Sequence, residues 1–119
     1  MRQYDLENSM LTWLDRYEEQ EISEYRINRE YFLFIDTQDT EEAEETAKKT
    51  MDGIRGVFNW IIDTQDTEDG LKMVMIGIEA DEYGYDADEA DEKVQQMIDE
   101  VLRHNEDIED YDSDFIEAA

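Results

Sequence analysis

Residues 57–78 read VFNWIIDTQDTEDGLKMVMIGI, two apolar runs separated by a polar stretch that ends in Gly70. Both runs, at 57–62 and 71–78, are rich in β-branched and large apolar side chains, which favours strands. The polar stretch at 63–70 consists of residues that are typical of turns. We therefore predict two strands joined as a hairpin.

The segments around this hairpin extend it into a mixed fold. Residues 30–35 (EYFLFI) form an aromatic and branched run that predicts a buried strand. Asp39 or Thr40 can cap a helix in which acidic residues precede lysines, as the helix dipole favours. A last helix is predicted from about Asp86 to Arg103, where apolar residues keep to one face. The inward residues are Ala43, Ala47, Met51 and Ile54 in the first helix and Ala87, Ala90, Val94, Met97, Ile98 and Val101 in the second.

Both ends of the chain carry further signals. Apolar residues at helical spacing predict a helix over residues 4–19. Residues 106–119 are interpreted as an acidic C-terminal tail or as a short docked strand near residues 111–116, and both alternatives stay open. The predicted class is α+β, an N-terminal helix followed by a ferredoxin-like strand-helix-strand-strand-helix sheet, with a final strand optional and the helices on one face. Residues 1–105 are expected to form a single acidic domain.

A seven-residue repeat follows two of the predicted strands. Residues 35–41 (IDTQDTE) recur unchanged as residues 62–68. If a helix connects the two strands they run in the same direction, so Asp36, Asp39, Asp63 and Asp66 are expected at one end of the sheet. The repeat is either turn and capping chemistry used twice or a shared site for a cation or partner.

Charge is the main functional signal. The 119 residues hold 36 Asp and Glu against 10 Lys and Arg, a net charge of -26, which argues against direct binding to nucleic acid. Residues 61–119 contribute 21 of these acids and only 3 bases. No cysteine and a single histidine, His104, give no zinc pattern, and no phosphate loop, nucleophile elbow or EF-hand occurs. We expect neither catalytic residues nor a metal or cofactor, and no membrane-spanning segment.

The acids gather in two stretches that we predict to bind a partner. Eight lie in the fourteen residues from Glu79 to Glu92 without a base. On the predicted helix, Asp88, Glu89, Glu92, Asp99 and Glu100 are expected to point away from the apolar face. Asp88 and Glu92 are like charges four residues apart, which costs a few tenths of a kcal/mol. The full set of predicted partner-binding residues is Glu79, Asp81, Glu82, Asp86, Asp88, Glu89, Asp91, Glu92, Asp99, Glu100, Glu106, Asp107, Glu109, Asp110, Asp112 and Asp114.

In size, in net charge and in the acidic stretches at 88–100 and from residue 106 onward, the chain resembles the DNA-mimic anti-defence proteins that phages and mobile elements use against restriction, CRISPR or repair enzymes. The resemblance is one of charge and size and rests on no shared motif. It implies an inhibitor, not an enzyme, that occupies the basic groove of a nucleic-acid-binding protein such as a nuclease or defence complex. Such a protein would act in the cytoplasm, that of the host cell if a phage encodes it, as a monomer or homodimer.

Three other functions stay open at this point. The first is an acidic binding or chaperone protein for a basic partner, without DNA mimicry. The second is adaptation to high intracellular salt with an unrelated function, and the third is an enzyme. Displacement of a bound target by DNA separates the first from mimicry.

Overall fold

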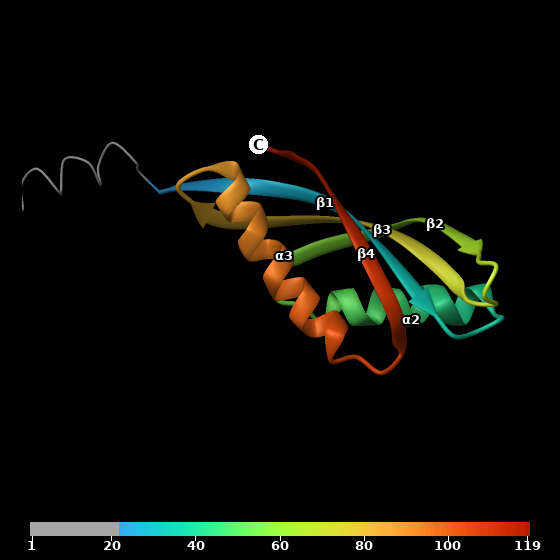
Figure 1. The fold of residues 1–119 in the computed structure, drawn as a ribbon. Coiled ribbons are helices and arrows are strands. Elements are labelled where there is room, and N and C mark those ends of the chain that lie inside the picture. Colours follow the sequence, from blue (N-terminus) through green and yellow to red (C-terminus); the bar gives the residue numbers. More distant parts are fainter. Residues whose placement is uncertain (1–21) are drawn as a thin grey trace, which may run out of the picture.

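The computed structural model describes residues 22–119, which form four strands and two helices (Figure 1). The predicted helix over residues 4–19 lies outside the described residues. The class is α+β, as the sequence predicts. In chain order the elements are β1 (Ser23–Ile35), α2 (Thr40–Asp52), β2 (Val57–Asp66), β3 (Lys72–Gly84), α3 (Ala87–Arg103) and β4 (Ile108–Ala118).

The strands form one sheet in the order β2-β3-β1-β4, and every neighbouring pair is antiparallel. β1 and β3 pair along their whole lengths, from Ser23 opposite Gly84 to Ile35 opposite Lys72. β2 and β4 are therefore the two outer strands. The predicted hairpin of β2 and β3 is confirmed.

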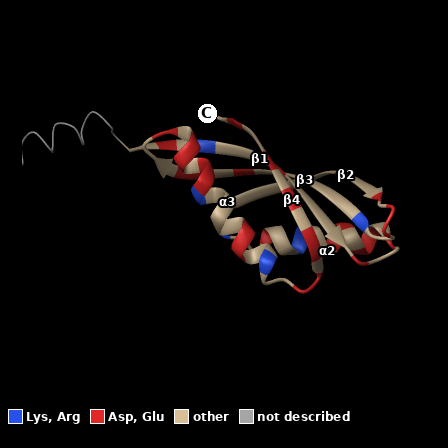
Figure 2. Ribbon diagram, viewed as in Figure 1, with Lys and Arg blue, Asp and Glu red and all other residues tan. Residues whose placement is uncertain are grey.

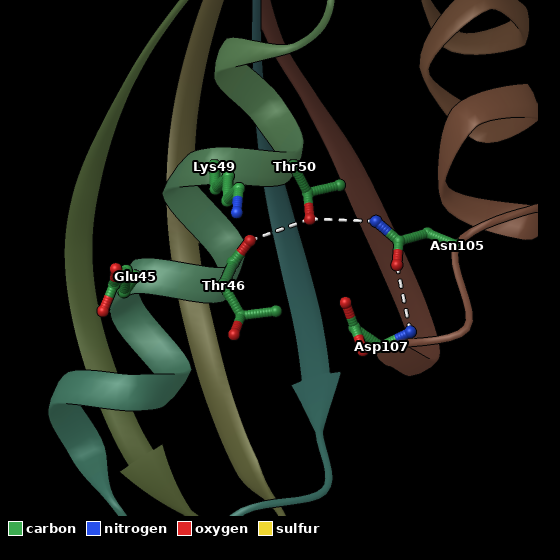
Figure 3. Close-up of a pocket in the computed structure, with 6 residues that line it drawn as sticks. All are labelled: Glu45, Thr46, Lys49, Thr50, Asn105 and Asp107. Atoms are coloured by element: carbon green, nitrogen blue, oxygen red, sulfur yellow. Dashed lines mark hydrogen bonds between the residues drawn. The ribbon is translucent and has the colours of Figure 1, made fainter.

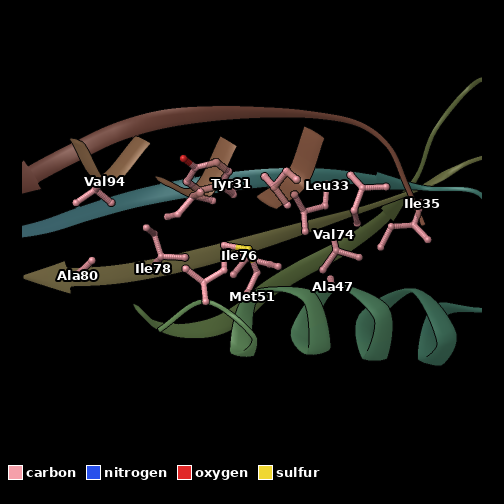
Figure 4. Packing of buried hydrophobic residues seen from close by; sticks show 14 of the residues in the cluster. Tyr31, Leu33, Ile35, Ala47, Met51, Val74, Ile76, Ile78, Ala80 and Val94 are labelled. Carbon is pink, nitrogen blue, oxygen red and sulfur yellow. The ribbon is translucent and has the colours of Figure 1, made fainter. Parts of the chain in front are cut away.

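The core lies on one face of this sheet. Alternate residues of β1 and β3 are fully buried there, and α2 and α3 both cover that face. Figure 4 shows side chains of both strands meeting Met51 and Ala47 of α2 and Val94 of α3. The opposite face, which we call the open face, carries no helix of the described residues. The buried strand residues are Ile27, Tyr31, Leu33 and Ile35 in β1 and Val74, Ile76, Ile78 and Ala80 in β3.

Both helices begin where the sequence predicts. The Asp39 side chain accepts a hydrogen bond from the Glu41 N–H, and the Asp86 side chain accepts one from the Glu89 N–H. Each carboxylate satisfies a backbone donor that the first turn leaves free and faces the positive end of the helix dipole. The buried face of α3 includes Leu102, whereas the predicted inward residues Met97 and Val101 are exposed.

All four strands are longer than predicted, β2 by four residues. β1 begins at Ser23 rather than residue 30, and β3 continues to Gly84 rather than ending at residue 78. The expected tail or short strand at the C-terminus is the eleven-residue strand β4. In β1, in the end of β3 and in β4, most outward positions are charged or polar, so the added segments have low hydrophobicity but largely keep a period of two.

The predicted loop at 63–70 is also shorter than expected. β2 continues through Asp66, and the turn is closed by Thr67, whose backbone N–H donates to the carbonyl of Leu71 at 2.9 Å. Gly70 has φ +81°, a conformation that glycine adopts without strain. Thus the second copy of the repeat lies mainly in a strand, whereas the first ends a strand and caps α2.

The two copies of the repeat nevertheless lie at the same end of the sheet. Ile35 of β1 and Asp66 of β2 both pair with Lys72 of β3. Lys72 forms an ion pair with Asp66, and Gln38 of the first copy donates to the carbonyl of Gly70 beside the second, at 2.8 Å. The expected placement is confirmed, and its visible role is to close this end of the sheet.

Candidate binding surfaces

A row of carboxylates lies along β4 on the open face. Asp110, Asp112 and Asp114, which we call the β4 row, pair with Phe34, Phe32 and Glu30 of β1. All three are exposed, and none forms an ion pair within the described residues. The intervening residues Tyr111 and Ser113 turn toward the helix-covered face, because successive side chains of a strand point to opposite faces.

Glu30 adds a like charge to the β4 row. It lies directly opposite Asp114 on the neighbouring strand. Two like charges directly opposite each other destabilise a sheet. The cost is roughly 0.2–1 kcal/mol, about as much as an opposite-charge pair would contribute. Stability of the isolated chain therefore does not account for this pairing.

A second acidic surface lies on α3. Asp88, Glu92 and Glu100, which we call the helix surface, are exposed on the side of α3 that faces away from the sheet. Glu100 is partly balanced by Arg103 at 2.9 Å, and its other carboxylate oxygen is in hydrogen-bond contact with His104 Nε2 at 3.1 Å. Figure 2 shows acidic residues over the first half of α3 and along β4. Because α3 covers the face opposite the β4 row, the structure separates the predicted acidic residues into two surfaces.

On the flank of α3 that faces β4, two of the predicted partner-binding residues form contacts within the fold. Asp99 was expected to point away from the sheet, yet its Oδ1 accepts a hydrogen bond from the Tyr31 hydroxyl at 3.3 Å. Asp91 is also turned inward, where its two oxygens accept from Nη1 of Arg29 at 2.7 and 2.8 Å. Nη2 of the same guanidinium donates to Ser113 Oγ at 2.8 Å. These contacts join α3, β1 and β4, so Asp91 and Asp99 serve the fold.

The remaining predicted residues are dispersed. Glu79 and Asp81 lie on the open face, where both are within 3.3 Å of Arg26, and Glu89 is 3.5 Å from Lys93. Asp86 is the N-cap of α3. The others are Glu82 near the end of β3, Glu106 and Asp107 in the α3–β4 loop, and Glu109 at the start of β4.

Burial changes the protonation equilibria in the Tyr31 contact. Burial, and next the negative charge of Asp99, raise the pKa of the Tyr31 phenol well above its usual value of 10.0. Burial likewise raises the pKa of Asp99, while the Tyr31 hydrogen bond and the charges of Arg29 and Arg103 oppose that rise. The folded state therefore holds Tyr31 in its neutral, donating form.

This contact predicts a loss of stability at alkaline pH. Above about pH 10 a tyrosine of the unfolded chain releases its proton, whereas Tyr31 in the folded chain keeps it. The folded state then binds more protons, so stability falls as pH rises, by at most about 1.4 kcal/mol per pH unit for this group. Urea unfolding between pH 8 and 11.5 measures the slope. Tyr31→Phe is expected to reduce it, and equal slopes in the two proteins would contradict the assignment.

Sequence reasoning missed an apolar surface on the open face. Phe32 and Phe34 of β1 and Met73 and Met75 of β3 are partly buried there, and Phe58 and Trp60 of β2 lie on the same face, opposite Glu79 and Gly77 of β3. The signal was present, because these residues alternate with the inward residues of the same strands. The prediction of strands at 30–35, 57–62 and 71–78 does not separate the two faces of those strands.

A polar pocket of about 300 Å³ lies between α2 and the α3–β4 loop (Figure 3). Asn105 donates to Thr50 Oγ1 at 3.0 Å, and Thr50 in turn donates to the carbonyl of Thr46 at 2.8 Å. The Asp107 N–H donates to Asn105 Oδ1 at 3.0 Å. These groups hold the loop against α2, and their geometry presents no nucleophile paired with a base.

Residues 22–119 offer neither a metal centre nor a membrane-spanning helix. In that part of the chain no cluster of three or more acidic or histidine side chains is arranged to hold a metal ion. None of its helices is long and apolar enough to cross a membrane. Comparison with known protein families, curated proteins and solved structures finds no match to this chain.

Proposed function

We propose that this protein is an acidic DNA mimic that occupies the cationic nucleic-acid-binding groove of another protein and blocks DNA binding there. The observation that carries the proposal is the β4 row, three exposed carboxylates on one face of an outer strand with no cation paired to them in residues 22–119. A cationic groove would supply the missing partners, and a net charge of -26 would attract it from a distance.

The spacing of the β4 row suits this role. Alternate residues of a strand lie about 6.8 Å apart. One strand of duplex DNA carries a phosphate per about 3.4 Å of axis, so the row has the spacing of alternate phosphates along that axis. The unfavourable pairing of Asp114 with Glu30 would be relieved when a cation approaches.

The helix surface supports the proposal less strongly. The sequence places five acids in the seven positions 86–92, but Asp86 caps α3, Asp91 binds Arg29 and Glu89 faces Lys93. Asp88 and Glu92 are left without a paired cation, one turn apart, and Glu92 accepts a hydrogen bond from the Gln96 side chain at 3.4 Å. We therefore assign the principal contact to β4 and a secondary one to α3.

We also propose that the sheet is ferredoxin-like and that the protein is an inhibitor and not an enzyme. The chain order strand-helix-strand-strand-helix-strand and the sheet order β2-β3-β1-β4 support a ferredoxin-like assignment. The protein would act by binding and not by catalysis, on a nuclease or defence complex in the cytoplasm. Fold alone would not give this function, which rests on the charged surface.

Competition with DNA tests the proposal. The full-length protein is immobilised, basic proteins are captured from a lysate, and duplex DNA is then added at fixed ionic strength. We expect DNA to release the captured protein, and added salt to weaken its capture steeply. Polyglutamate of equal total charge is the control for a general polyanion effect. A captured protein that stays bound under saturating DNA would refute mimicry and favour the acidic chaperone.

A further inference from the structure

The outer strand β2 carries an exposed aromatic pair at an unpaired sheet edge. Phe58 is 69% exposed and Trp60 is 42% exposed, and both lie on the open face. β2 pairs with β3 on one side and with no described strand on the other. An apolar outer strand of this kind is a template for pairing with another chain.

The aromatic pair is held in place by the sheet beneath it. The Trp60 indole lies over Gly77, so closely that a Cβ at that position would be 2.5 Å from the ring. The Phe58 and Trp60 rings are 5.8 Å apart and inclined at 42°. Because the glycine admits the ring, the surface is formed before any partner arrives, which lowers the entropic cost of binding.

Charge selects the kind of partner. Residues 56–62 contain no charged side chain, whereas β4, the other outer strand, carries five acids. Two copies of a chain with net charge -26 repel each other over most of their surfaces. The outer edge of β2 is a place where two copies can meet without placing carboxylates opposite one another.

We propose that β2 pairs with β2 of a second copy, antiparallel and about a two-fold axis at Asn59. Only every second residue of a strand directs its N–H and C=O groups toward the outer edge. A symmetric pair must therefore place even-numbered residues opposite even-numbered ones and odd-numbered opposite odd-numbered ones. Centring on Asn59 satisfies this condition and sets Phe58 of one copy opposite Trp60 of the other. Arg55, in the turn just before β2, forms no ion pair among the described residues, and in this pair it would lie at the same end as Asp63 of the second copy, which follows the β-bulge at Ile62.

Sedimentation of the full-length chain tests the proposal. At micromolar concentration we expect a particle of twice 14.2 kDa. Raising the salt from about 0.1 to 0.5 M should strengthen the dimer, because it screens the repulsion between the copies. Phe58→Asp should raise the dissociation constant at least about tenfold. The matched control is Ile116→Asp, a residue of β4 that is 51% exposed, and it should leave the dimer unchanged.

A charge-reversal cycle tests the register. Arg55→Asp and Asp63→Arg should each raise the dissociation constant about tenfold, since each places like charges together at two symmetric positions. The double variant should return the constant to within about threefold of the original. Circular dichroism confirms that every variant is folded. If Phe58→Asp unfolds the chain, the surface reversals at 55 and 63 decide the question.

Three results would overturn the proposal. These are a chain that is monomeric at both salt concentrations, a dimer indifferent to Phe58→Asp, or a double reversal that fails to restore association. In the first case residues 1–21 or another protein would be the occupant of the β2 edge. The inference is independent of the proposed function, because salt should weaken capture of a basic target but strengthen the dimer.

Discussion

Reversing Asp110, Asp112 and Asp114 to lysine together is expected to weaken binding to the cationic target about 100-fold or more. Each change removes an attraction and introduces a like charge in the groove, so about 1 kcal/mol per position already gives this factor. The fold should survive, because the three side chains are exposed and form no ion pair in the described part of the chain. Lysine opposite Glu30 should even relieve the repulsion on β1.

The matched control changes the charge equally at another place. Glu45, Glu68 and Asp69 are exposed and lie on α2 and in the β2–β3 turn. Their reversal to lysine changes the net charge by the same amount and should reduce affinity only a fewfold, through the long-range field. Fluorescence anisotropy of the target with labelled DNA, competed by each variant, measures the difference. Equal losses in the two triple variants would remove β4 from the binding surface.

A variant of the helix surface decides between the two acidic regions. Asp88→Lys with Glu92→Lys leaves α3 capped by Asp86 and leaves the Arg29 contact intact. We expect a smaller loss than from the β4 row. A larger loss would move the principal contact to α3.

Arg29→Met is expected to reduce the free energy of unfolding by about 3–5 kcal/mol. Arg29 is 4% exposed, and its guanidinium joins Asp91 of α3 to Ser113 of β4. The substitution keeps the apolar stem but leaves the Asp91 carboxylate, 15% exposed, without its cation. Removing one partner of a buried ion pair costs far more than the pair contributes, because the other charge stays desolvated. Urea unfolding at pH 7 measures the loss.

Two further variants test whether the unpaired charge of Asp91 causes this loss of stability. Arg29→Met combined with Asp91→Leu should recover most of the loss, because no unpaired charge is then left. Arg26→Met, on the same strand but in an exposed ion pair that water screens, should cost far less than Arg29→Met. A loss below about 1 kcal/mol for Arg29→Met would show that α3 and β4 are held by other contacts.

Arg29 also explains why the sequence understated the sheet. A charged residue stands at an inward position of β1, so residues 23–29 lack the apolar signal of a strand, although Tyr25 and Ile27 keep the alternation. The sequence also predicts β4 and the end of β3 as too short, for the related reason that most of their outward positions are acids. In so acidic a chain, alternation between acids and other residues marks a strand better than hydrophobicity does.

For the candidate binding surfaces, the sequence predicts that the residues are acidic but not which of them lie together in the fold. The capping residues and the buried stripe of α3 are local features, so sequence spacing determines them. The inward turn of Asp91 and Asp99 depends on Arg29 and Tyr31, which lie more than sixty residues away in the chain. The division of the acids between the open face and α3 likewise follows from sheet order, which local patterns do not specify.

The difference between the two outer strands also limits how far the protein can polymerise. A sheet whose two edges both accept new strands can grow into a fibril. Here the edge of β4 presents five carboxylates, and a second β4 beside it would set rows of like charge in register. Growth by backbone pairing would therefore stop after a single step at β2, which gives a closed and soluble particle instead of a filament.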